Sequence, residues 1–403
     1  MSELRQSFVA FFTSLKLTIA LLALSIILVF WATLAQVKLG IWGVQREFFQ
    51  TFFVLGKFPG TDVLIPLFPG GYFIGGLLLI NLVASHFHRF KMTWKKSGIF
   101  LTHFGLILLL VGELLTGLWQ EDFQMRLDEG QTKNYSESIR ESELAIIDAT
   151  DPEYDDVVAI PAERLARSKE TQHPKLPFRV ITRAFYPNAF VEQAPESGPG
   201  PATPEVPVVA TRDAGLRLAV RPQPITYRDN ERNWATAFVE LIGPDGSLGV
   251  WMVSSLLINP QSFDYAGRTY RLQMRLERNY KPFSLTLLDF SHDRYAGTEI
   301  PKNFSSHLRL KTDDGKDDRE VLIYMNNPLR HGGLTFYQAS FDNNDQTTVL
   351  QVVRNPSWLL PYVSCVLMSL GLLVQFGMHL VGFVRKRTAS STPVPSTAAR
   401  ATR

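Results

Sequence analysis

The residue with the clearest potential for chemistry is His103, which lies in the apolar stretch from Ser97 to Trp119. About 20 apolar residues span the hydrocarbon core of a bilayer, so this stretch is long enough to cross one. Ionisable groups inside a membrane are costly and usually mark a functional site. A neutral imidazole in an apolar pocket is a standard axial ligand for haem iron. The alternative is that His103 hydrogen-bonds a neighbouring helix and only fixes packing.

A second histidine, His379, lies in the last apolar run, shortly before Arg385. His103 follows the basic Lys96 at a similar spacing, so the two imidazoles are expected at nearly the same depth. Gln375 precedes His379 by about one helical turn. The sequence therefore allows a bis-histidine site, while a simple contact of His379 with lipid head groups is the competing interpretation.

The remaining ionisable candidates have weaker patterns. His86 and His88 form an H-x-H pair without a nearby cysteine or carboxylate, which favours an anchor at the membrane interface over a metal site. Glu113 fits a proton-transfer or salt-bridge group and fits a hydrogen bond to another helix equally well. The histidines of the polar block lack zinc-ligand spacing and are interpreted as structural, unless one meets a haem that leaves the membrane. These are His173, His292, His307 and His331.

Known catalytic motifs are missing from the sequence: it has no nucleophile elbow, P-loop, GxGxxG or HExxH. The single cysteine, Cys365, excludes an intramolecular disulfide, a CxxC redox motif and a CxxCH site for covalent haem. A formal net charge of +3 without a basic, aromatic-rich stripe gives no reason to expect nucleic-acid binding. The chain is therefore not expected to be an enzyme by itself.

The elements that must position these residues are predicted from hydropathy. Four transmembrane helices are expected, at about residues 17–36, 66–85, 97–118 and 356–384. An interfacial helix is expected around EFFQTFFVLG, between the first two spans. In the third span, Gly98, Gly105 and Gly112 recur every seven residues and favour close approach of another helix. His103 lies about 200° away from Gly105 around that helix.

Basic residues predict the orientation of the spans. The loop of residues 86–96 contains four Lys or Arg residues and no acid, and residues 385–387 read RKR. Loops rich in Lys and Arg stay in the cytoplasm. Both termini are therefore expected in the cytoplasm, with the chain in the inner (cytoplasmic) membrane and residues 119–355 on the periplasmic face. The tail of residues 385–403 is expected to be disordered.

The polar block, residues 119–355, has short alternating runs separated by Gly, Pro, Asn and Asp, the pattern of antiparallel β structure. A flexible insertion is expected at about residues 193–207. Residues 258–272 and 326–340 share Asn-Pro, a turn and Gly-x-Thr-aromatic, which predicts two similar hairpins. The fold class is thus an integral membrane protein with three N-terminal and one C-terminal transmembrane α-helices (residues 1–118 and 356–384) and a large extracytoplasmic β-rich domain.

Several segments resemble one family. LLDFSHDRYAGTEIPKNFSSHLRL (287–310) and VLIYMNNPLRHGGLTFYQASF (321–341) resemble signatures of the ResB-like family of cytochrome c biogenesis proteins (System II). SLKLTIALLALSIILVFWATLAQ near the N-terminus and THFGLILLLVG in the third span are similar to the same family. The order of three spans, an outer domain and a fourth span is also that of the family.

The resemblance implies a role as a subunit of a membrane complex with a ResC-type (CcsA-type) partner. Such a complex carries haem b across the membrane and supports its covalent attachment to apocytochrome c, with thioredoxin-like reductant proteins as further partners. His103 matches the family's intramembrane haem ligand, and the partner holds the tryptophan-rich motif that presents haem. Two alternatives stay open: a haem-free assembly scaffold, and a b-type electron carrier that uses His103 and His379 within one chain.

Overall fold

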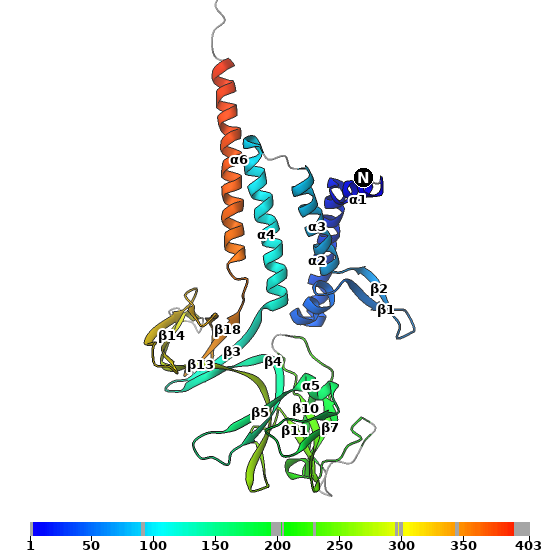
Figure 1. The fold of residues 1–403 in the computed structure, drawn as a ribbon, viewed down its shortest axis with the longest axis vertical. Coiled ribbons are helices and arrows are strands. Elements are labelled where there is room, and N and C mark those ends of the chain that lie inside the picture. Colours follow the sequence, from blue (N-terminus) through cyan, green and yellow to red (C-terminus); the bar gives the residue numbers. More distant parts are fainter. Residues whose placement is uncertain are drawn as a thin grey trace, which may run out of the picture. The chain divides into compact units, whose positions relative to one another are not determined.

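The computed structural model describes residues 3–89, 93–194, 203, 205–228, 231–294, 297, 301–342 and 346–390. The chain divides into two compact units, drawn as ribbons in Figure 1. The helical unit comprises Met1–Lys38, Gly43–Gln120 and Asn355–Arg403, and the β unit comprises Leu39–Trp42 and Glu121–Arg354.

The helical unit contains four helices that are long and apolar enough to cross a membrane, among the described residues. They are α2 (Leu15–Val44), α3 (Gly71–Arg89), α4 (Ser97–Trp119) and α6 (Leu360–Ser390). Two shorter helices precede them, α1 (Glu3–Phe12) before α2 and the 3₁₀ turn η2 (Trp94–Lys96) before α4. The expected pattern of three N-terminal apolar helices and one C-terminal apolar helix is therefore confirmed.

The segment between the first two spans differs from the prediction. Instead of an interfacial helix, it forms a π-helical turn, η1 (Gln45–Phe49), and a hairpin of β1 (Phe53–Lys57) and β2 (Leu64–Pro69). Helix α3 consequently begins at Gly71, later than the predicted residue 66. The physical reason is local: prolines lack the N–H group that a helix needs, and Pro66 and Pro69 both lie in β2.

The last helix also departs from the predicted boundary. The sequence predicts a disordered tail from residue 385, but helix α6 continues to Ser390, so residues 385–390 are helical. Residues 391–403 lie outside the described part of the chain.

Helix α4 packs closely against α6, and α3 contacts its other side (Figure 1). The three buried residues of α4 are Gly98, Gly105 and Gly112, the glycines of the predicted stripe. A Cβ atom added at Gly98 would lie 2.6 Å from the carbonyl oxygen of Gly371 in α6. The stripe is thus the surface on which α6 lies, because only glycine permits so close an approach.

The β unit is built on a ten-stranded antiparallel sheet. Its strands are β3 (Glu121–Asp128), β4 (Thr132–Asp148), β5 (Asp156–Pro161), β12 (Gln261–Tyr265), β13 (Arg268–Arg294), β14 (Pro301–Thr312), β15 (Asp318–Tyr324), β16 (Leu329–His331), β17 (Leu334–Asp342) and β18 (Thr347–Arg354). The path of neighbouring strands is β15-β14-β13-β4-β3-β18-β17-β16, with β12 paired to β13 and β5 to β4.

Smaller elements complete the unit. A four-stranded sheet has the order β11 (Gly246–Ser254), β10 (Thr236–Gly243), β7 (Arg179–Tyr186) and β6 (Glu170–Thr171). A separate pair joins β8 (Ala189–Gln193) and β9 (Leu218–Pro222), and α5 (Ala162–Arg167) and η3 (Asp213–Leu216) are short helical turns. The predicted flexible insertion at 193–207 lies mostly outside the described residues, but Val206 packs in a small core with Phe238 and Met252.

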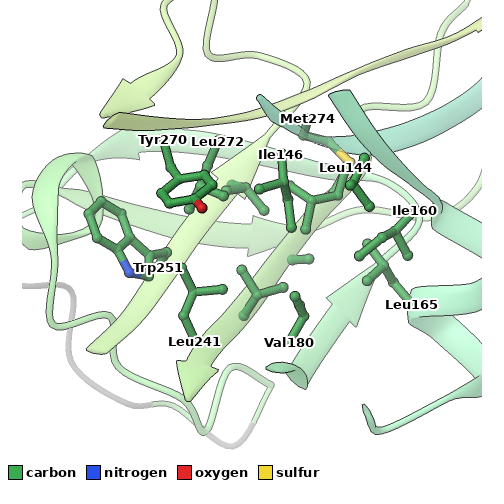
Figure 2. Packing of buried hydrophobic residues seen from close by; sticks show 14 of the residues in the cluster. Leu144, Ile146, Ile160, Leu165, Val180, Leu241, Trp251, Tyr270, Leu272 and Met274 are labelled. Carbon is green, nitrogen blue, oxygen red and sulfur yellow. The ribbon is translucent and has the colours of Figure 1, made fainter. Parts of the chain in front are cut away.

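Two hydrophobic cores share the long strand β13. Its first half contributes Tyr270, Leu272 and Met274 to a core with β4 and the four-stranded sheet, shown in Figure 2. Its second half contributes Phe283 and Leu285 to a separate core with β3, β14, β17 and β18. Between the halves the β4–β13 register shifts twice. One continuous strand therefore connects two lobes, and polar side chains are concentrated where the ladder is irregular.

Both predicted hairpins are present. Strands β12 and β13 turn at Ala266 and Gly267, and β16 and β17 turn at Gly332 and Gly333. All four residues have positive φ, the signature of a two-residue type I′ turn, which matches the twist of the flanking strands.

Candidate functional site

The imidazole of His103 is oriented by its own helix. Its Nδ1 atom lies 2.8 Å from the carbonyl oxygen of Ile99, one helical turn earlier in α4. A carbonyl only accepts hydrogen bonds, so Nδ1 carries the proton and the lone pair of the neutral ring lies on Nε2. Histidines that ligate metals commonly donate their other N–H to a backbone carbonyl in this way. His103 is thus held in the tautomer that a metal ligand requires.

A second histidine lies next to His103, and it is His86 of α3. The His86 side chain is 4% exposed, and its ring centroid lies 4.3 Å from that of Phe100 and 6.3 Å from that of Phe104. Phe100 and Phe104 lie on either side of His103 in α4, so His86 packs against the part of α4 that contains His103. The sequence pattern predicts an interfacial anchor for the H-x-H pair, yet only His88 is exposed.

Sequence reasoning underrated His86 although a signal was present. His86 and His103 flank the same basic loop, and helices joined by a short loop run antiparallel, so both side chains fall near the same end of the two helices. The H-x-H motif that contains His86 suggests metal-ligand spacing. The informative feature is instead that His86 and His103 lie near the same end of the two helices.

The structure does not bring His379 to His103. His379 is exposed on α6, and the amide nitrogen of Gln375 donates to its Nε2 at 2.8 Å. Helix α6 packs on the glycine side of α4, whereas His103 lies about 200° away from that side. The Nε2 atom of His379 already accepts a hydrogen bond, and α6 packs on a side of α4 other than that of His103. The structure therefore gives no support to a bis-histidine site formed by His103 and His379.

The chemistry of His103 fits a haem iron, which its Nε2 atom would hold. The site offers the Nε2 lone pair of His103, and Phe100 and Phe104 of the same helix carry aromatic rings that pack near His86. Elsewhere in the described residues, no group of three or more His, Cys, Asp or Glu side chains is placed to hold a metal ion. His103 Nε2 would supply a single histidine ligand of the kind that haem iron takes.

The histidines of the β unit are separate from one another. His307 pairs with Glu320 at 3.0 Å, and the ring of His331 packs edge-on against Phe283 at 4.7 Å. His173 accepts a hydrogen bond from the backbone of Lys175 at 3.3 Å. His292 packs on Phe341 with ring centroids 4.3 Å apart.

Sequence reasoning missed one further polar group, Lys281. Its side chain is buried at 5% exposure, and Nζ donates to Ser136 Oγ at 2.8 Å and to the carbonyl and side-chain oxygens of Asn279 at 3.0 and 3.2 Å. Burial lowers the pKa of Lys281 to about 8. It lines a cavity of about 500 Å³ with Phe123 and Arg354. In the sequence, Lys281 falls within an ordinary strand pattern. Its burial becomes apparent only from the register shift in β13.

Comparison with known proteins places the relationship in the β unit. Residues 257–349 match the model of the ResB-like family. The chain is also similar to Protein NrfI of Wolinella succinogenes, with 38% identity over 92 residues, which cover 23% of this chain and 10% of that protein. The chain's match thus spans about a tenth of the length of this curated relative. The family match covers the predicted signature segments at 287–310 and 321–341, so the resemblance inferred from them is confirmed.

Proposed function

We propose that this chain, a ResB-like protein by its residues 257–349, acts in cytochrome c biogenesis as a membrane subunit that handles haem. The observation that carries the haem part of the proposal is the hydrogen bond from His103 Nδ1 to the Ile99 carbonyl, which leaves Nε2 as the ligand atom. The family match supports the pathway, and the half-buried, oriented imidazole supports the role in it.

The proposed membrane placement follows from the four apolar helices and the basic residues beside them. The loop between α3 and α4 and the end of α6 are rich in Lys and Arg, so both are assigned to the cytoplasmic side of the inner membrane. The β unit then lies on the periplasmic side. In this orientation His103 is near the cytoplasmic end of its span, the side on which haem b enters.

Haem is the cargo of the proposed reaction. His103 Nε2 would hold its iron, the surrounding apolar side chains would exclude water, and the Ile99 carbonyl would keep the imidazole from rotating. Ligand release then lets the haem move outward, where the β unit contacts apocytochrome c. The covalent attachment itself is assigned to the complex with a ResC-type partner, with thioredoxin-like proteins keeping the apocytochrome cysteines reduced.

The test is the haem spectrum of the purified chain, alone and co-expressed with a ResC-type partner. We expect His103→Gly to lose the bound haem and added imidazole to restore it, because a free imidazole can occupy the space of the deleted ring. His379→Gly is the matched control, since its ring is exposed and hydrogen-bonded to Gln375, and its haem content should stay at the wild-type level.

The other outcomes separate the alternatives. Unchanged haem in His103→Gly contradicts the ligand assignment. A wild-type chain without haem in either preparation favours the haem-free scaffold. Stable, redox-active haem in the isolated chain that depends on both His103 and His379 favours the b-type electron carrier.

A further inference from the structure

Helix α4 contains a second ionisable side chain, Glu113, which takes no part in the packing of α4 against α6 or in the proposed haem site. The carboxylate of Glu113 is exposed and makes no hydrogen bond or ion pair with any residue in the described part of the chain. Glu113 precedes Trp119, the last residue of α4, by about 9 Å along the helix axis. In the proposed membrane placement it therefore lies inside the hydrocarbon region, where charged and polar side chains are placed toward partners.

The surroundings of Glu113 on α4 form an open strip. Leu106, Glu113 and Gly117 lie within about 40° of one another around the helix. Leu106 is 38% exposed, and a Cβ atom added at Gly117 would meet nothing within 4 Å. We call these three residues the Glu113 strip. Around α4, the Glu113 strip lies between the glycine side, which faces α6, and the side that carries His103, which faces α3. Neither α6 nor α3 therefore covers the strip.

Lipid is a poor occupant of the Glu113 strip because it offers a carboxylate no hydrogen-bond donor in the hydrocarbon region. A second copy of this chain related by a twofold axis would place two Glu113 carboxylates opposite each other, and like charges at an interface disfavour association. Charge complementarity instead requires a cation. Gly117 lies one turn from Glu113, so another helix can approach the carboxylate closely.

We propose that the Glu113 strip binds a transmembrane helix of another protein that presents a lysine or arginine side chain to Glu113. The inference rests on the proposed membrane placement and names how the partner of the proposed complex is recognised. Because His103 borders the strip and lies about 15 Å from Glu113 along the axis, the docked helix would also cover the edge of the haem site. Glu113 is a positioning residue in this scheme and does not touch the haem.

The experiment is co-purification of the tagged chain with a ResC-type chain in mild detergent, for the wild type, Glu113→Leu and Glu113→Gln. Glu113→Leu makes the span more apolar, so membrane insertion is not impaired. We expect at least tenfold less ResC-type chain with Glu113→Leu. Glu113→Gln should give an intermediate loss, since the amide still accepts a hydrogen bond without carrying charge. The matched control is Leu118→Gln, which adds the same amide on an exposed position on another side of α4.

His103→Gly separates this inference from the proposed haem function. It should lose haem yet still co-purify with the ResC-type chain, whereas Glu113→Leu should lose the partner. Wild-type recovery of the ResC-type chain with Glu113→Leu overturns the inference, as does a wild-type chain that does not bind it at all. A homodimer that Glu113→Leu dissociates would also overturn it, in favour of a second copy on the strip.

Discussion

The Nδ1 atom of His103 donates a hydrogen bond to the carbonyl oxygen of Ile99 at 2.8 Å. This single contact fixes both the rotation of the ring and the nitrogen that carries the lone pair. The side chain of His86 in α3 packs on Phe100, which precedes His103 in α4, with ring centroids 4.3 Å apart. The two histidines thus have different surroundings, which suit His103 to the role of a ligand and His86 to that of a packing residue.

Replacing His86 should weaken haem binding without removing the ligand. In His86→Leu we expect haem occupancy to fall severalfold, because His86 packs against Phe100 and Phe104 of α4 and its loss changes the surroundings of His103. Added imidazole should not restore it, since the iron ligand is still present. The measurement is the haem-to-protein ratio with and without imidazole, compared with His103→Gly. Imidazole rescue of His86→Leu would show that His86 itself is a ligand.

The contrast between His86 and His379 shows what sequence can predict at this site. His103 is identified from an apolar stretch and its depth, because both depend only on local composition and spacing. The sequence does not identify His86 as a neighbour of His103. Which of the two flanking helices, α3 or α6, faces a given side of α4 depends on how the glycine stripe packs. The sequence predicts the glycine stripe from its spacing, but that α6 is the helix packed on it depends on the tertiary structure.

Close packing of α4 on α6 should depend on Gly98. A Cβ atom there would lie 2.6 Å from the Gly371 oxygen and 2.7 Å from the Gln375 nitrogen, both backbone atoms that cannot move aside without shifting the helix. Overpacking of this kind typically costs about 1–3 kcal/mol. We expect Gly98→Ala to lower the thermal midpoint of the full chain in detergent and to broaden its size-exclusion peak.

The control for Gly98→Ala is Gly377→Ala, because Gly377 is in α6 and a Cβ atom added there meets nothing within 4 Å. Alanine favours helix over glycine by about 1 kcal/mol, so this variant should be as stable as the wild type or more so. Equal loss of stability in both variants would mean that the glycine stripe does not hold the two helices together.

Burial of Lys281 predicts a pH dependence. Its pKa is about 8 in the folded state against 10.5 in the unfolded chain, so between these values the unfolded state binds more protons. Stability rises with pH where the unfolded state binds more protons. The cost of burying the charge is therefore complete below pH 8 and disappears as the pH rises to about 10.5. A pKa shift of this size corresponds to at most about 3 kcal/mol in the free energy of unfolding.

Lys281→Met provides the comparison that isolates this effect. The difference in thermal midpoint between wild type and Lys281→Met, measured on the full chain in detergent from pH 7 to pH 10, should move in favour of the wild type as the pH rises. A difference that stays constant over this range would contradict the buried, pKa-shifted lysine.

For the β unit too, the sequence predicts the local features but not the long-range pairing of strands. Alternation and turn residues give the strands, and Gly332 and Gly333 give a type I′ hairpin, because these signals are local. The two lobes on one strand, and the polar residues buried at the shift between Leu276 and Arg278, depend on the register of β13 with β4. That pairing joins strands that are more than a hundred residues apart in the chain, and local patterns do not determine it.

One buried ion pair at this junction allows a sharp test. Arg275 Nε and Glu143 Oε1 are 2.9 Å apart, with side chains 8% and 4% exposed. The Arg275 Nη2 atom makes no hydrogen bond with a described residue, so the pair is incompletely satisfied. Removing one member of a buried pair leaves an uncompensated charge, which typically costs about 3–5 kcal/mol, whereas replacing both by apolar residues is often nearly neutral.

We therefore expect Arg275→Met and Glu143→Leu each to destabilise the β unit strongly, and the double variant to be more stable than either. The readout is hydrogen exchange of peptides from β4 and β13 in the full chain at increasing urea concentration, which reports the local free energy of opening. Arg179→Met is the control, because Arg179 and Glu170 form a pair in the four-stranded sheet whose side chains are 46% and 47% exposed, and such surface pairs contribute about 0–1 kcal/mol. Additive losses in the double variant would show that Arg275 and Glu143 stabilise the junction through separate contacts, because two residues that act only through each other cannot lose more together than each loses alone.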